Sequence, residues 1–318
     1  MKCIKILSIV VALSGLTAVS SAQTLQDVIE ARNNGSDFLG ANDLDGAISE
    51  LEKCVELAKQ VGEEAEEHQV LAESALPDLY LKKANTINAT RDYPATLKAL
   101  EATVAAAEKY SNAGVKEKAE KIIPTVYLAV GTAEYSAKNY EEAIKNLDQA
   151  IERDPNMARA YFLKGASYQQ MRDDAKMEDS YRLAIEKGTA AGDASSVQSA
   201  KTQLSRFFLN TGITAQKTKK WDDAITAFTK TIEVDDANAD AYYSLLVSYV
   251  EKKSWDNAIA LEEKVLELKS GDGAYYFLAS AYLGKNNNAK ACEYFKMVGE
   301  GTYLNSAKHY IEHTLKCK

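Results

Sequence analysis

The chain has 318 residues, of which 46% are apolar and 26% are charged, and its formal net charge is −8. Such a composition is typical of a folded globular protein and excludes a chain that is disordered throughout. It also argues against nucleic-acid binding, because phosphate affinity needs clustered Lys and Arg, and the sequence has no basic block. The chain has only four prolines, and its many Ala, Leu, Glu and Lys residues favour helix over strand.

The chain begins with a predicted secretory signal peptide, residues 1–22. Lys2 and Lys5 give it a basic start, residues 6–19 are an apolar run, and small residues end at Ala22. The run is shorter than the ~20 residues that a membrane-spanning helix needs, and an uncleaved anchor is the alternative. We expect cleavage after Ala22, export to the periplasm or the medium, and a mature chain with no transmembrane segment and a net charge of −10.

The strongest feature of the chain is a spacing of 34 residues between equivalent positions. Gly131 and Gly165 lie 34 residues apart, and Gly212 and Leu246 repeat that spacing. In each case a large aromatic residue lies four residues before this position, and a residue suited to close packing lies twelve residues after it. With Ala279 as a fifth position, the aromatic residues are Tyr127, Tyr161, Phe208, Tyr242 and Tyr275, and the later residues are Ala143, Met177, Ala224, Ala258 and Ala291. A fixed period of this length predicts stacked helical units.

Several stretches resemble the tetratricopeptide repeat. Residues 161–168 read Tyr-Phe-Leu-Lys-Gly-Ala-Ser-Tyr, and residues 139–147 read Asn-Tyr-Glu-Glu-Ala-Ile-Lys-Asn-Leu. Residues 154–156, Asp-Pro-Asn, follow where the family commonly places its closing proline, and residues 221–228 repeat the opening of the second helix. The resemblance implies an all-α, right-handed superhelical solenoid of about seven antiparallel helix hairpins with a C-terminal capping helix. A plain helical bundle is the alternative, but bundles do not repeat Gly, aromatic and Ala at a fixed period.

The predicted repeats are unequal in length. The small positions Gly35 to Ala279 follow one another at intervals of 49, 47, 34, 47, 34 and 33 residues. The three long intervals predict lengthened helices, in which Pro77 and Pro124 mark kinks or restarts. No long Gly-, Ser- or Pro-rich linker divides residues 23–318, so we expect one domain. Its repeats are predicted near residues 28–61, 77–110, 124–157, 158–191, 205–238, 239–271 and 272–302, with the capping helix at 303–316.

One acidic stretch echoes a calcium-binding loop. Asp43, Asp45 and Glu52 have the spacing of EF-hand ligands, but the first ligand position is Ala41, which has no side-chain oxygen. The stretch coincides with the turn inside the first repeat, where small acidic residues cap the second helix. We therefore expect helix caps and no calcium site.

Three cysteines follow the signal peptide. Cys54 lies where the resemblance implies a small packed residue, so we expect a buried thiol. Cys292 and Cys317 either form a disulfide that attaches the capping helix to the last repeat or remain free thiols. Cys317 also continues a helix-face stripe of His309 and His313. Three ligands without a remote fourth make a weak metal site, and we predict none.

Catalytic motifs are missing from the sequence. It contains no phosphate-binding Gly-rich loop with Lys, no H-E-x-x-H, no G-x-S-x-G and no C-x-x-C. Its three His offer few bases for a nucleophile. We predict that the protein is not an enzyme and needs no cofactor; an enzyme with an unrecognised site is a rival hypothesis.

In the tetratricopeptide family the first helices of the hairpins line a concave groove, and the resemblance implies such a groove here. Its mixture of aromatic and polar residues suits an extended peptide or a partner helix. We therefore expect a protein–protein interaction scaffold in the periplasm or cell envelope, with another protein or peptide as partner. A glycan or small-ligand receptor that uses the aromatic residues is the alternative. The implied groove residues are Leu128, Thr132, Tyr135, Arg159, Phe162, Arg206, Leu209, Asn210, Tyr243, Ser244, Tyr276 and Phe277.

Overall fold

The structure is a computed structural model that describes residues 23–317. These residues form helices joined by turns and short loops, with no strand among them, so the all-helical prediction is confirmed. The predicted signal peptide, residues 1–22, lies outside the described residues. Within residues 23–317, no helix combines the length and hydrophobicity that crossing a bilayer requires.

The chain divides into two compact units, residues 1–123 and 124–318. The division falls inside one helix, α5 (Ala113–Ser136), and not at a linker. This division does not test the prediction of a single domain.

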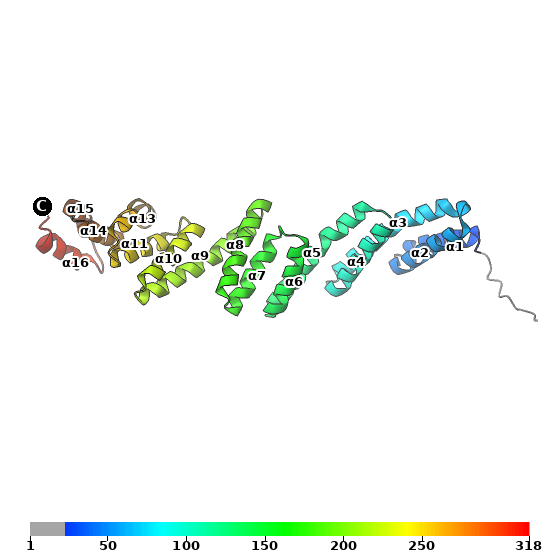
Figure 1. Ribbon diagram of the computed structural model, residues 1–318, viewed down its shortest axis with the longest axis horizontal. Coiled ribbons are helices and arrows are strands. Elements are labelled where there is room, and N and C mark those ends of the chain that lie inside the picture. The colour runs from blue at the N-terminus through cyan, green and yellow to red at the C-terminus, as the bar shows by residue number, and fades with distance from the viewer. Residues whose placement is uncertain (1–22, 318) are drawn as a thin grey trace, which may run out of the picture. The chain divides into compact units, whose positions relative to one another are not determined.

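The described part of the first unit contains two complete helix hairpins and the start of a third. In each hairpin the two helices pack against each other along their length (Figure 1). Val28, Val55 and Leu76 are fully buried between the helices, and a single 3₁₀ turn, Glu63–Ala65, joins the hairpins. The helices are α1 (Leu25–Gly40), α2 (Leu44–Val61), α3 (Glu66–Ala89) and α4 (Tyr93–Lys109).

The second unit continues the same arrangement through five hairpins, the first of which begins in α5. Consecutive helices pack as neighbours from α6 to α12 and from α13 to α15 (Figure 1). The helices are α6 (Tyr140–Arg153), α7 (Ala158–Met171), α8 (Asp174–Ala191), α9 (Ala194–Lys217), α10 (Trp221–Val234), α11 (Ala239–Glu251), α12 (Trp255–Ile259), α13 (Glu262–Lys269), α14 (Asp272–Gly284), α15 (Asn288–Met297) and α16 (Leu304–His309).

The small positions of the repeat allow the two helices of a hairpin to approach closely. A Cβ atom added to Gly212 in α9 would lie 2.5 Å from the ring of Phe228 in α10. The same atom on Gly165 would lie 2.7 Å from the ring of Tyr181. Phe228 and Tyr181 are fully buried. Glycine at this position therefore makes room for the aromatic residue that fills the hairpin core.

Each of the three long intervals between small positions lengthens two helices, the second helix of one hairpin and the first helix of the next. The helices α3, α5 and α9 each have 24 residues, whereas α7 has 14. The preceding helices α2, α4 and α8 have 17 or 18 residues, whereas α6 and α10 have 14. Pro77 and Pro124 lie inside α3 and α5, so the helices continue through them and neither proline marks a restart.

The sixth hairpin departs from the repeat. Its second helix breaks after Ile259 into α12 and α13. Glu262 stands where the other hairpins carry an aromatic or leucine residue, and its carboxylate accepts hydrogen bonds from the hydroxyls of Tyr282 and Tyr294. Burial, and then these hydrogen bonds, raise the pKa of Tyr282 to about 12 and that of Tyr294 further.

The C-terminal segment covers the last hairpin. It consists of α16 and a single π-helical turn, Tyr310–Thr314, in place of one capping helix. The ring of Tyr310 stacks on that of Phe295 with centroids 4.8 Å apart. Lys316 adopts a left-handed conformation (φ +50°) that turns the chain back, and Cys317 forms a disulfide with Cys292 across a Cα–Cα distance of 5.7 Å.

Candidate interaction surface

The twelve predicted groove residues all lie in the second unit, on the first helices of its hairpins. Arg159, Arg206 and Asn210 are exposed, and Phe277 is buried. The other eight are half-buried. An open surface therefore exists near α7 and α9, whereas the aromatic positions further along the chain are largely used in packing.

The last three aromatic residues of the predicted groove belong to the core at the C-terminal end. The ring of Tyr276 stacks on Tyr303 with centroids 4.7 Å apart, and Phe277 meets Tyr303 edge-on at 5.4 Å. Tyr243 contacts Phe277 at 6.1 Å. Burial, assisted by a hydrogen bond with Tyr303, raises the pKa of the Tyr243 hydroxyl. The C-terminal segment covers these rings, so they do not offer a free aromatic platform to a glycan.

The half-buried residues closer to the middle of the unit also contact their neighbours. The ring of Tyr135 lies 5.7 Å from that of Tyr140, and Phe162 lies 5.6 Å from Tyr181. Leu128 and Leu209 pack against core clusters of adjacent helices. The Thr132 hydroxyl donates to the carbonyl of its own helix at 2.7 Å, and the Ser244 carbonyl accepts from the Gln216 amide at 3.2 Å. These residues therefore form the floor of a surface, and their side chains are mainly used in contacts within the protein.

Arg206 in α9 lies between two open pockets. One has a volume of ≈ 480 Å³ and extends from α9 to the loop that follows α10. The other, of ≈ 360 Å³, lies between α7 and α9. Arg206 is exposed, and no carboxylate in residues 23–317 forms an ion pair with it. We call the lining of the two pockets the α9 surface; it comprises Gln169, Gln198, Lys201, Thr202, Ser205, Arg206, Phe207, Leu209, Asn210, Thr211, Thr214, Val234, Asp235, Asp236 and Asn238.

One wall of the larger pocket is held by a polar network. The hydroxyl of Ser205 donates to the Asp235 carboxylate at 3.3 Å, and the Asn238 amide donates to that carboxylate at 3.0 Å and to Ser205 at 3.2 Å. The side-chain oxygen of Asn238 also caps α11 by accepting from the Ala241 backbone N–H at 3.0 Å. The network fixes the loop after α10 against α9, so the pocket is preformed.

Sequence reasoning missed much of this wall. Gln198 and Lys201 lie in the extra turns of α9, which the 34-residue register does not cover. Asp235 and Asn238 lie in the loop between hairpins, whereas the groove residues that the family resemblance implies all lie on helices. The two consecutive acidic residues Asp235 and Asp236, shortly before Asn238, were the available sequence signal for a polar pocket wall.

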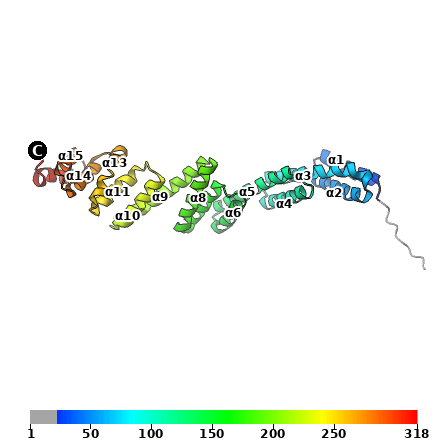
Figure 2. The ribbon, with the colours of Figure 1, turned by 45° about the horizontal axis from the view of Figure 1, so that its top comes forward.

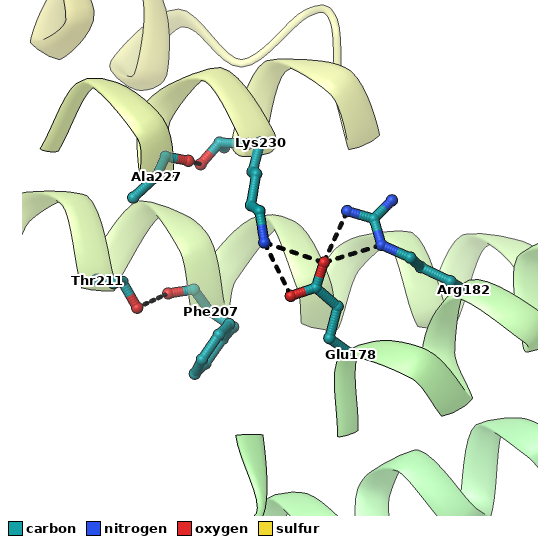
Figure 3. A network of polar contacts seen from close by, with 7 residues as sticks. Glu178, Arg182, Phe207, Thr211, Ala227 and Lys230 are labelled. Carbon is teal, nitrogen blue, oxygen red and sulfur yellow. Dashed lines mark hydrogen bonds and ion pairs between the residues drawn. The ribbon is translucent and has the colours of Figure 1, made fainter. Parts of the chain in front are cut away.

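Beside the α9 surface, α8 and α10 carry cations that are paired. Lys230 in α10 donates to both oxygens of Glu178 in α8 at 3.2 and 3.0 Å, and Arg182 donates to the same carboxylate at 2.9 Å (Figure 3). Burial would raise the pKa of Glu178, but the hydrogen bonds from Lys230 and Arg182 outweigh it and hold the pKa below its usual value. Figure 3 shows Phe207 and Thr211 of α9 beside this group. The charges are satisfied here, in contrast to Arg206.

Arg159 at the start of α7 is partly engaged. Its guanidinium lies 5.5 Å from the ring centre of Phe162, a cation–π distance. It also contributes to a lowered pKa of Asp193, whose main cause is the hydrogen bonds from Ser196 at the start of α9. Arg159 is therefore less available to a partner than Arg206.

The acidic residues of the calcium-loop-like stretch have structural roles. Asp43 caps α2 by accepting from the Gly46 backbone N–H at 2.9 Å, Asp45 forms an ion pair with Lys83, and Glu52 accepts from the Tyr80 hydroxyl at 2.9 Å. No group of three His, Cys, Asp or Glu side chains within residues 23–317 lies close enough to hold a metal ion.

The remaining cysteine and histidine of the first unit lie together. Cys54 is fully buried, and its Sγ lies 3.9 Å from the carbonyl oxygen of His68. Burial raises the pKa of this thiol. The ring Nδ1 of His68 lies 3.1 Å from the Arg32 guanidinium. Both residues thus serve the packing of α1 to α3.

Stacked hairpins with an open, polar surface define a helical-repeat protein of the kind that binds other proteins. Sequence comparison identifies the family. The tetratricopeptide repeat family matches residues 209–273 and, in a second form, residues 158–186 and 273–296, and a TPR repeat of the same family matches residues 131–171. This protein is a tetratricopeptide repeat protein. Such repeats are protein–protein interaction modules. A search of curated protein sequences found no match to the chain.

Solved structures that match this chain have low sequence identity and low TM-scores. The protein MamA is 23% identical over 60% of this chain and 96% of its own, with a TM-score of 0.29. YrrB, described as a TPR protein with an unusual peptide-binding site, is 20% identical over 54% and 83%, with a TM-score of 0.31. A tetratricopeptide repeat protein from Parabacteroides merdae is 15% identical over 92% and 100%, with a TM-score of 0.31. Similarities this low transfer neither a ligand nor a partner.

Proposed function

We propose that this protein is a non-enzymatic interaction scaffold whose α9 surface binds a segment of a partner protein. The carrying observation is Arg206, an exposed cation with no ion pair within residues 23–317, placed between two open pockets. A guanidinium in such a position gains more from a carboxylate than from water, because it offers a planar pair of donors. The matching partner is an extended peptide or a helix with an acidic side chain opposite Arg206.

The neighbours of Arg206 support a peptide ligand. Lys201 adds a second exposed cation to the larger pocket, and Gln169 and Asn210 offer amides in the smaller one. Leu209 and Phe207 supply half-buried apolar surface beneath them. An apolar surface with a few polar groups that orient the partner is the usual composition of a specific protein interface.

Partner capture from the native host tests this function. Arg206→Glu should reduce the amount of the stoichiometric partner that co-purifies, by about tenfold or more, because a charge pair at the interface is lost and replaced by repulsion. Arg172→Glu is the matched control, since Arg172 is an exposed arginine of the same unit outside both pockets. A co-purifying sugar without any protein, or equal capture by both variants, contradicts the proposal.

We also propose export to the periplasm or the medium. The support is the basic start, apolar run and small residues of positions 1–22. The disulfide between Cys292 and Cys317 agrees with it, because such bonds persist in oxidising compartments. N-terminal sequencing of the protein isolated from its host tests the proposal. A mature chain that starts at Gln23 is expected, and one that starts at Met1 in the cytoplasmic fraction contradicts it.

A further inference from the structure

Four large apolar side chains of the first unit are exposed. Phe38 and Leu39 at the end of α1 are each 39% exposed, and Val70 and Leu71 near the start of α3 are 56% and 48% exposed. The helices α1 and α3 lie side by side in both views (Figure 1 and Figure 2). Single exposed apolar residues are common, so the observation that counts is which of these four line a groove.

Two of these four residues, Leu39 and Leu71, stand at the edge of a groove between α1 and α3. The groove has a volume of ≈ 460 Å³. Its small residues, such as Gly35 and Ala75, leave the space open, and the buried side chains of Leu51 and Leu79 form its floor. Its full lining is Arg32, Gly35, Ser36, Leu39, Leu51, Leu71, Ala72, Ala75, Asp78 and Leu79, and we call it the α1–α3 groove.

The close packing of α1 on α2 fixes the floor of the groove. A Cβ atom on Gly35 would lie 2.9 Å from Cγ of Leu51. On α1 the lining runs from Arg32 to Leu39, which is about 10 Å along the helix axis. That length accommodates two apolar side chains that lie one helical turn apart on a partner.

The charge around the groove is strongly negative. Residues 61–80, which include the start of α3, contain six acidic residues and no Lys or Arg. Asp78 lines the groove, and Glu67 lies one turn before Leu71 on the same helix face. Arg32 is the single cation among the lining residues, and it is occupied by His68 and Asn33 at 3.1 Å each.

We infer that the α1–α3 groove binds an amphipathic helix of another protein, with two apolar side chains in the groove and Lys or Arg beside them. The apolar lining supplies the affinity, and the acidic surroundings select a basic partner. A second copy of this chain fits poorly, because residues 23–123 carry 19 acidic against 11 basic residues and would repel themselves. The groove lies in a different unit from the α9 surface, so this inference does not depend on the proposed function.

Binding of designed peptides to the full mature chain tests the inference. The probe is a fluorescent helical peptide of about 14 residues, made of Leu, Ala and Lys with Leu at positions i and i+4. A matched peptide carries Glu in place of every Lys. In fluorescence anisotropy, the Lys peptide should bind at least about tenfold more tightly than the Glu peptide, and this preference should weaken with added salt.

Substitutions in the chain test whether the peptide binds in the α1–α3 groove. Leu71→Glu should weaken the Lys peptide by about tenfold or more, because it places a charge at the apolar edge of the groove. Val70→Glu is the matched control: it adds the same charge at the neighbouring exposed position, which does not line the groove, and should change binding by less than about threefold. Arg206→Glu should leave this binding unchanged.

Three results would overturn the inference. One is equal loss of binding in the Leu71 and Val70 variants, with circular dichroism showing both folded. Another is wild-type binding by the Leu71 variant. The third is a wild-type dimer by light scattering that Leu71→Glu converts to a monomer, since the groove would then hold a second copy of the chain.

Discussion

The two units of the chain share their packing chemistry and differ in their surfaces. Residues 23–123 carry 19 acidic against 11 basic residues, whereas residues 124–318 carry 27 against 25. The first unit exposes apolar side chains beside a groove, and the second exposes polar pockets around Arg206. The matches to the tetratricopeptide family all fall in the second unit.

The shared packing is visible at equivalent glycines. A Cβ atom on Gly35 in the first unit would lie 2.9 Å from Leu51, and one on Gly131 in the second would lie 2.8 Å from Leu147. The same close approach of two helices therefore builds both units. Since each hairpin contacts mainly its neighbours, the outward residues of one unit can change without disturbing the other. The units therefore share the residues that pack their hairpins and differ in the exposed side chains around them.

The largest effect is expected from removing a core aromatic residue of one unit. Phe228→Ala should destabilise the second unit by about 3–5 kcal/mol, because Phe228 is fully buried and its removal leaves a cavity. Hydrogen exchange should show lost protection in residues 194–251 and unchanged protection in residues 25–109. Leu100→Ala is the counterpart in the first unit and should give the reverse pattern. Loss of protection throughout the chain in either variant would contradict the independence of the two units.

Loss of the disulfide should have the next largest effect, and this effect belongs to the second unit alone. Cys317→Ser opens a loop with a sequence separation of 25 residues, whose closure is worth about 3.5 kcal/mol of unfolded-chain entropy. Residues 303–317 should lose hydrogen-exchange protection and expose the rings of Tyr276 and Phe277. Cys54→Ser provides a control, since that thiol is unpaired and lies in the first unit. Equal protection of residues 303–317 in the wild type and the Cys317 variant would contradict this prediction.

The ion pairs at Glu178 should give a smaller, pH-dependent effect. The side chain of Glu178 is 22% exposed, and its two cationic partners are more exposed, so we expect Glu178→Gln to cost about 1 kcal/mol at neutral pH. Its pKa is lowered from 4.5 in the folded protein. Its stabilising contribution is therefore present above that value and is lost as the pH falls through the lowered pKa. Urea unfolding of both proteins should show their stabilities converging as the pH falls below 4.5; a constant difference would contradict this account.

The smallest effect on stability is expected at the binding surfaces. Arg206→Glu and Leu71→Glu should each change the free energy of unfolding by less than about 0.5 kcal/mol, because both side chains are exposed. Thermal or urea unfolding measures this directly. A large loss of stability in either variant would mean that the residue serves the fold and not a partner.

The fold was predictable from the sequence to a large degree, and the site only in part. Gly131, Gly165 and Gly212 mark close helix approaches that permit few substitutions, so their spacing reveals the hairpins. The function of Tyr276 was not predictable, since an aromatic residue at a groove position looks the same whether a partner or Tyr303 covers it. The pocket wall at Lys201 depends on extra turns of α9 whose length the sequence shows but whose direction it does not.

Site-specific photo-crosslinking tests the central claim, that the α9 surface holds the partner, most directly. A photo-reactive amino acid at Asn210, inside this surface, should form a covalent adduct with a single partner protein in the native host. The same amino acid at Thr229, which is exposed on α10 outside both pockets of the α9 surface, should not. Adducts at Thr229 and none at Asn210 would contradict the account.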